Sequence, residues 1–273
     1  MFGSEQNTII LSLYAILPAI IIFFYIYKRD YFPEPPRIVF ITLLLGAGIS
    51  FPLMILIPFF EGYLETTNFG IESNHFYMSF IRAAFLEETL KFLIVIYYCL
   101  YLQEFNEPMD ALVYSVAASI GFAVYENWEY VISGSKVSLT FAKDIALIRA
   151  FSAVPLHALT GVFMGFFLIE AIFDKINKKL FLFLALFFPI CLHGLYNLIL
   201  SSNNFSTYWI YILLIIFIIR AYFVFKKERN LQKFQNNRFS KTIPKHSDII
   251  FSILVSGFIL FSFNYFVNFV LYR

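Results

Sequence analysis

The chain has 273 residues, of which 60% are hydrophobic, 21% aromatic and only 14% charged, and its formal net charge is +2. With a mean hydropathy of +0.75, it is far more apolar than a soluble globular domain. The composition excludes a soluble fold and predicts a polytopic integral membrane protein. The lipid bilayer is then an obligatory partner, and no nucleic acid is expected as one.

The apolar residues are grouped in eight stretches, each near the roughly 20 residues that a membrane-spanning helix needs. In hydrocarbon the backbone must be hydrogen-bonded within the segment, and the short alternating pattern of a β-barrel is absent from the stretches. We therefore predict a single all-α transmembrane domain over residues 1–273, with its polar motifs in a core at about 76–201. The predicted spans are 8–27, 38–60, 76–102, 109–132, 144–170, 180–201, 206–225 and 248–271.

Lysine and arginine gather after the first, fifth and seventh spans, and these loops lie on one side if the spans alternate. By the positive-inside rule that side is the cytoplasm, so both termini are expected to be extracytoplasmic. The basic segment 226–247 is predicted to be a cytoplasmic loop that contacts anionic lipid head groups. The proline-rich segment Tyr31–Pro36 is expected to form a stiff connector at the same membrane face.

The third span carries Glu87, Glu88 and Lys91 within its apolar run. Each ionisable group costs roughly 2.5–3.5 kcal/mol at the centre of a membrane helix, so these residues need a stabilising partner or a function. One interpretation is structural, because either glutamate can pair with the lysine one turn on and hold helices together. The other is that they belong to a functional site.

The next three spans contain matching polar side chains, several of them at helical spacing. Each has a structural interpretation when taken alone: a carboxylate or arginine near the membrane surface, or a hydrogen-bonded histidine in the core. Separately, however, each would be an unpaired polar group in hydrocarbon, so we expect them to share one polar cavity between the midplane and the outer surface. They are Glu126, Asn127 and Tyr130 in the fourth span, with Phe122 one turn before Glu126 on the same face, Arg149 and His157 in the fifth, and His193 and Asn197 in the sixth.

Two chemistries fit such a cavity. A buried glutamate can deprotonate water while histidines, an amide or a cation stabilise negative charge on a carbonyl oxygen. Alternatively, His157, His193 and Glu126 could bind a catalytic zinc ion, with another glutamate as base. No serine or cysteine is accompanied by the partners of a nucleophile. Water-mediated amide hydrolysis is therefore the predicted reaction.

The ordered motifs resemble those of the PrsW family of intramembrane proteases, which is related to the Abi proteins and the CAAX prenyl endopeptidases. The resemblance covers about residues 31–200. The wider superfamily often has arginine after the paired glutamates and histidine in the phenylalanine motif, and the residues found here favour the PrsW branch. The motifs are Glu87-Glu88-x-x-Lys91, Phe122-x-x-x-Glu126, His157 and His193-x-x-x-Asn197.

The resemblance implies roles for the motif residues. Glu87 and Glu88 would include the catalytic base, and the choice between them stays open because adjacent helical residues point roughly 100° apart. The other implied active-site members are Glu126, His157, His193 and Asn197.

The resemblance also implies a membrane-spanning protein substrate, such as an anti-sigma factor, cut near its outer side in a bacterial cytoplasmic membrane. It leaves the cofactor open between one Zn²⁺ and none, and it does not predict the oligomeric state. Two other functions remain open from the residues alone. Buried glutamate, histidine and lysine also build the proton relays of secondary transporters and ion-coupled carriers. A non-catalytic membrane interaction protein could retain the same side chains.

Overall fold

The computed structural model describes residues 2–173, 177–202, 204–234 and 239–272, and every regular element among them is helical. This confirms the predicted all-α class. Elements α4, η1 and α5 follow one another without a gap, and η1 is a π-helix. The elements are α1 (Phe2–Tyr27), α2 (Pro36–Gly48), α3 (Ser50–Glu65), α4 (Ile71–Phe76), η1 (Tyr77–Phe85), α5 (Leu86–Tyr97), η2 (Cys99–Tyr101), α6 (Pro108–Ser135), α7 (Leu139–Phe151), α8 (Ala153–Ile172), α9 (Lys178–Ser201), α10 (Tyr208–Phe234) and α11 (His246–Leu271).

Seven helical segments of the described chain are long and apolar enough to cross a membrane. The remaining predicted span, 76–102, is also helical, because α4, η1 and α5 run continuously from Ile71 to Tyr97. It carries more charged residues than any other predicted span, with Arg82 and the trio at 87, 88 and 91. The most highly charged of the predicted spans is thus the one that begins the motif series.

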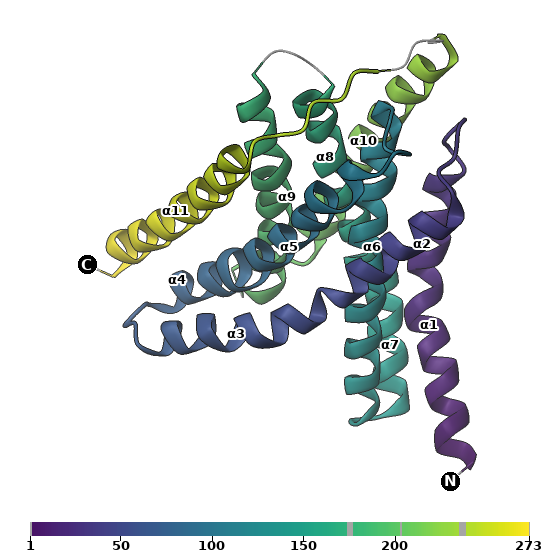
Figure 1. Cartoon of the computed structure of the whole chain (residues 1–273). Helices are drawn as coiled ribbons and strands as arrows, with labels where there is room; N and C mark the ends of the chain where they lie inside the picture. The colour runs from purple at the N-terminus through teal and green to yellow at the C-terminus, as the bar shows by residue number, and fades with distance from the viewer. Residues whose placement is uncertain (1, 174–176, 203, 235–238, 273) are drawn as a thin grey trace.

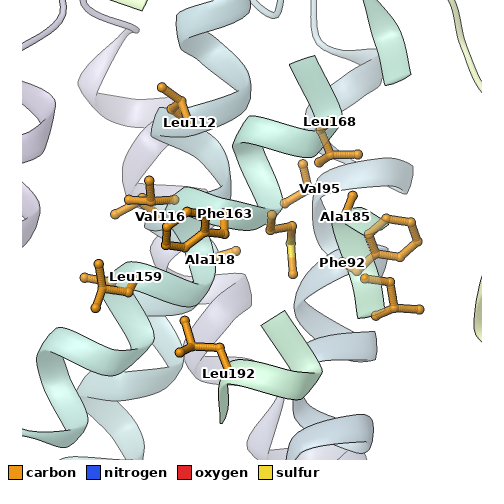
Figure 2. Packing of buried hydrophobic residues seen from close by; sticks show 14 of the residues in the cluster. Phe92, Val95, Leu112, Val116, Ala118, Leu159, Phe163, Leu168, Ala185 and Leu192 are labelled. Atoms are coloured by element: carbon orange, nitrogen blue, oxygen red, sulfur yellow. The ribbon is translucent and has the colours of Figure 1, made fainter. Parts of the chain in front are cut away.

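The centre of the bundle is formed by α6 and α8. In α6, 89% of the membrane-spanning window is buried inside the protein, against only 17% in α10, which lies at the periphery. Figure 1 shows α6 near the middle, with α1 and α7 beside it. Apolar side chains from α5, α6, α8 and α9 meet in one core, as Figure 2 shows. The four motif-bearing helices are therefore the four that pack together most deeply.

Two glycines let α8 approach α6 closely. A Cβ atom on Gly161 would lie 2.8 Å from the Ser115 carbonyl oxygen, and one on Gly165 would lie 2.5 Å from that of Ala111. Both distances are too short for any side chain, so these positions require glycine. Because His157 precedes Gly161 by one turn, the close contact also brings its imidazole against α6.

The predicted span 144–170 is interrupted in the structure. The chain leaves helical geometry at Ser152, so that α7 ends at Phe151 and α8 begins at Ala153. Pro155 accounts for this break, since it has no N–H to donate to the carbonyl four residues earlier. Arg149 and His157 consequently stand on different helices.

The structure differs from the prediction that residues 226–247 form a solvated loop. Helix α10 continues to Phe234, and the segment after residue 238 crosses over one end of the bundle before α11 begins (Figure 1). This segment is bound to the bundle, because the Lys241 ammonium donates to the carbonyl oxygens of Leu100 and Leu102 at 3.0 and 2.8 Å. The end of α1, the start of α9 and the end of α10 lie at this end and carry lysine and arginine residues, so we call it the basic end.

Candidate active site

The ammonium group of Lys91 stands at the centre of the motif residues. Lys91 is completely buried, and its Nζ donates to Glu88 Oε1 at 2.7 Å and to His157 Nδ1 at 3.1 Å. It lies 4.7 Å from the centre of the Phe122 ring and 3.9 Å from Glu87 Oε2. A single cation therefore contacts groups from α5, α6 and α8, which offsets part of the cost of burying the carboxylates.

This contact sets the tautomer of His157. An ammonium group can only donate, so Nδ1 of the imidazole must accept and the ring proton must be on Nε2. Nε2 lies 3.0 Å from Glu126 Oε2 and donates to it. Both ring nitrogens of His157 are therefore engaged, and the imidazole is fixed between α5 and α6.

The imidazole of His193 is bound on one side only. Its Nδ1 lies 2.8 Å from Glu88 Oε1 and donates to that carboxylate, which leaves the lone pair on Nε2. Nε2 faces Glu87 Oε2 at 3.8 Å, too far for a hydrogen bond. The rings of His157 and His193 are nearly perpendicular, with centroids 5.2 Å apart. Glu87 Oε2 on α5 and His193 Nε2 on α9 therefore form a pair of hydrogen-bond acceptors without a donor between them, which we call the open acceptor pair.

A second cation, Arg149, binds Glu126 at the edge of the network. Arg149 Nη2 lies 2.5 Å from Glu126 Oε2, and its Nε donates to Asn127 Oδ1 at 2.6 Å. Asn127 in turn donates to the Ala15 carbonyl of α1 at 2.7 Å. Arg149 is thus a structural partner of Glu126 and Asn127.

Asn197 is the one predicted site residue that the network does not include. It is half-buried on α9, and no other part of the described chain hydrogen-bonds to its amide. It follows His193 by one turn, so the two side chains emerge from the same face of the helix.

The two adjacent glutamates have different surroundings. The side chain of Glu88 is 0% exposed and its Oε1 is bound by both Lys91 and His193, whereas the side chain of Glu87 is 10% exposed. The Oε2 atom of each glutamate is buried without a hydrogen-bond partner, and that of Glu87 lies 3.8 Å from His193 Nε2. Glu88 is therefore placed to hold other groups, and Glu87 is placed to meet a substrate or water.

Three features near the site have no clear sequence signal or a weak one. The π-helix η1 immediately precedes the glutamates, and π-helical turns often occur at functional sites, but no residue pattern revealed it. Gly194, next to His193, lets α9 pack closely against η1, since a Cβ there would lie 2.3 Å from the Phe80 ring. A glycine beside a motif histidine is a weak sequence signal of such a close contact. The Tyr196 hydroxyl donates to Ser152 Oγ at 3.0 Å, and this link depends on the break between α7 and α8.

The donor set also fits a metal ion, although with different ligands from those predicted. Ligand atoms of Glu87, His157 and His193 lie within 4.8 Å of one another, and two histidines with a glutamate are typical of catalytic zinc. The Nδ1–H of His193 is bound to Glu88, as metal-bound imidazoles usually are. Glu126, the ligand expected from sequence, instead pairs with Arg149. His157 can offer Nδ1 only when the Lys91 ammonium withdraws.

Buried carboxylates and imidazoles that converge inside a membrane-spanning helical bundle are typical of membrane-embedded hydrolases. The profile of the PrsW family of intramembrane metalloproteases matches residues 34–222, which include every motif residue. Protease PrsW of Bacillus subtilis (strain 168) is 36% identical over 217 residues, covering 78% of this chain and 92% of that protein. Protease PrsW of Clostridioides difficile (strain 630) is 33% identical over 218 residues, covering 77% and 85%. No solved structure matches the chain.

The chain belongs to the PrsW family and is a membrane-embedded peptidase. The predicted membership and enzyme class are thereby confirmed, in preference to a transporter or a non-catalytic interaction protein. The metal named in the family description is compatible with the three ligand atoms found here.

Proposed function

We propose that this protein hydrolyses a peptide bond of a membrane-spanning protein near its extracytoplasmic boundary, with Glu87 as the group that activates water. The observation that carries the proposal is the open acceptor pair formed by Glu87 Oε2 and His193 Nε2, which are 3.8 Å apart. A water molecule between two acceptors donates a hydrogen bond to each and turns its lone pairs outward. That orientation suits attack on a carbonyl carbon.

In the proposed reaction the water oxygen bonds to the scissile carbonyl carbon while its proton passes to Glu87. The same proton then moves to the amide nitrogen as the carbon–nitrogen bond breaks, leaving a new carboxyl terminus and a new amino terminus. The free Asn197 amide, on the same face of α9 as His193, donates to the developing oxyanion. Glu88 and Lys91 orient the two imidazoles throughout.

A zinc ion, when bound, would be held by Glu87, His157 and His193, and would polarise the scissile carbonyl and increase the acidity of water. Two carboxylates of the chain would keep their tasks in its presence. Glu88 fixes the tautomer of His193, and Glu126 fixes the position of His157.

The positions of the site residues along their helices support an extracytoplasmic site. Glu126 follows the start of α6 at Pro108 by 18 residues (126 minus 108) and precedes its end at Ser135 by 9 (135 minus 126). Because α6 begins at the basic end, the site is nearer the opposite membrane face. The positive-inside rule makes the basic end cytoplasmic and both termini extracytoplasmic. A membrane-bound anti-sigma factor, the substrate class implied by the resemblance, has its cleavable region on that face.

The test is to search for the cleavage product without assuming a substrate. Membranes from cells that express the wild type or Glu87→Gln are compared by quantitative labelling of new protein amino termini. Glu65→Gln, the same change at an exposed position at the end of α3, is the matched control. We expect new termini near one boundary of a membrane span in the wild type and the control, and none in Glu87→Gln. Identical termini in all three samples would overturn the proposal.

A further inference from the structure

Four acidic residues form a second buried cluster at the basic end, away from the candidate active site. Asp30 follows α1, Glu34 lies in the proline-rich connector, and Glu107 and Asp110 stand at the N-terminus of α6. Asp110 is completely buried, and Asp30 and Glu34 are only 8% and 4% exposed. We call these four residues the acidic cluster.

The neutral hydrogen-bond donors around the acidic cluster reach only some of its carboxylate oxygens. Gln232 of α10 donates from Nε2 to Asp30 Oδ1 and to Glu107 Oε1, each at 2.7 Å. The Tyr114 hydroxyl donates to Glu34 Oε2 at 2.6 Å. Three helices, α1, α6 and α10, are therefore joined through one amide and one hydroxyl, and neither brings a positive charge.

Helix capping supplies a hydrogen-bond donor for one carboxylate oxygen of Asp110 but not for the other. Glu107 and Asp110 form a capping box, in which Asp110 Oδ2 accepts from the Glu107 backbone N–H at 2.8 Å. Asp110 Oδ1 and Asp30 Oδ2 remain buried without a hydrogen-bond partner. Ligand atoms of Asp30, Glu107 and Asp110 lie within 4.8 Å of one another, and Glu34 is joined to the same helix, α6, through Tyr114.

Within the described residues, none of the four carboxylates forms an ion pair with a lysine, arginine or histidine. Lys241 points to the backbone carbonyls of Leu100 and Leu102, and Arg229 stacks on the Tyr31 ring. Uncompensated buried carboxylates are costly. Such a cluster must share protons or bind a cation.

We propose that Asp30, Glu107 and Asp110, with Glu34 beside them, bind one hard divalent cation of the Mg²⁺ or Ca²⁺ type at the basic end. All the offered ligand atoms are oxygens, which such cations prefer, and neither imidazole nor thiol is offered that would favour zinc. The cation would connect the end of α1 to the start of α6, and through Gln232 to α10. This site is separate from the candidate active site and does not depend on the proposed peptidase mechanism.

The experiment uses the purified full chain in detergent. Mn²⁺ binding is followed by electron paramagnetic resonance, with Mg²⁺ and Ca²⁺ as competitors, and the melting temperature is measured against the concentration of each ion. The variants are Asp110→Asn and, in case that change prevents folding, Asp30→Asn. Glu65→Gln is the control, and Glu87→Gln removes a ligand of the candidate active site.

We expect saturable Mn²⁺ binding and an ion-dependent rise in melting temperature in the wild type, Glu65→Gln and Glu87→Gln. Both effects should be lost in Asp110→Asn and Asp30→Asn, and the stronger competitor identifies the preferred ion. Mn²⁺ binding that disappears only in Glu87→Gln would overturn the proposal. So would a wild type that binds no ion and is stabilised by Asp110→Asn, because the carboxyl groups would then share protons.

Discussion

The two buried carboxylate clusters of this protein differ in how their charge is balanced. In the candidate active site, Lys91 and Arg149 form ion pairs with Glu88 and Glu126 at 2.7 and 2.5 Å. In the acidic cluster, the described chain provides an amide and a hydroxyl but no cation. The first cluster has its own counter-ions, Lys91 on the same helix as Glu88 and Arg149 on a helix next to that of Glu126, and the second has none among the described residues.

The difference indicates what each cluster can do. Around Lys91, Oε1 of Glu88 and both ring nitrogens of His157 are bound, whereas Glu87 Oε2 faces His193 Nε2 at 3.8 Å without a hydrogen bond, and this is the gap where water can react. The unsatisfied oxygens of the acidic cluster, on Asp30 and Asp110, face other carboxylates. An arrangement of that kind suits the binding of an ion better than proton transfer to a substrate.

The largest expected effect distinguishes the two adjacent glutamates. Glu87→Gln keeps the shape of the side chain but cannot accept a proton from water, so cleavage should fall by about 10³-fold or more. The rate is measured on the substrate identified from its new amino terminus, with folding monitored by melting temperature. Glu65→Gln should retain the wild-type rate. A Glu87→Gln protein that cleaves within tenfold of the wild type would show that another group activates water.

The next prediction concerns the charge balance around Lys91. Lys91→Met leaves the Glu88 carboxylate buried without its cation, which should lower the free energy of unfolding by about 3–5 kcal/mol. Adding Glu88→Gln removes the unpaired charge, so the double variant should be more stable than Lys91→Met alone. Thermal unfolding in detergent measures both. A double variant less stable than either single variant would show that the pair does not interact as the 2.7 Å contact indicates.

The fold could be predicted from the sequence because the membrane imposes simple rules. Apolar length alone located the eight spans, and helical spacing placed Glu126 and Tyr130 on one face of α6. The ends of elements were less predictable, because α10 continues for two turns into a basic segment that reads as a loop. Charged residues do not end a helix once it has left the hydrocarbon.

The candidate site could be predicted as a set of residues but not as a network. Sequence placed the carboxylates and histidines on consecutive helices, yet the partner of each depends on how those helices rotate and shift. The break at Ser152, which Pro155 causes, and the π-helix η1 both change that rotation, and the size of the change cannot be read from the residues. This explains why Glu126 was expected as a metal ligand and instead lies against Arg149, while Glu87 faces His193.

A smaller effect is expected from the second cation of the active-site cluster. Arg149→Lys keeps a positive charge near Glu126 but loses the planar fork that also binds Asn127, which should lower stability by about 1.5–3 kcal/mol. Arg82→Lys is the matched control, because the Arg82–Glu61 pair is 30% and 41% exposed and should contribute under about 1 kcal/mol. Equal losses in the two variants, measured by thermal unfolding, would contradict the distinction between buried and exposed pairs.

The smallest expected effect belongs to the acidic cluster. Gln232→Met removes the amide that binds Asp30 and Glu107 while keeping the side-chain volume, and it should cost about 1 kcal/mol in ion-free buffer. A saturating divalent cation should restore much of that loss, because the ion attracts both carboxylates directly. Melting temperatures of the wild type and Gln232→Met, each with and without Mg²⁺ or Ca²⁺, test the point. If the difference between the two proteins is the same in every buffer, the amide and the ion do not act on the same carboxylates.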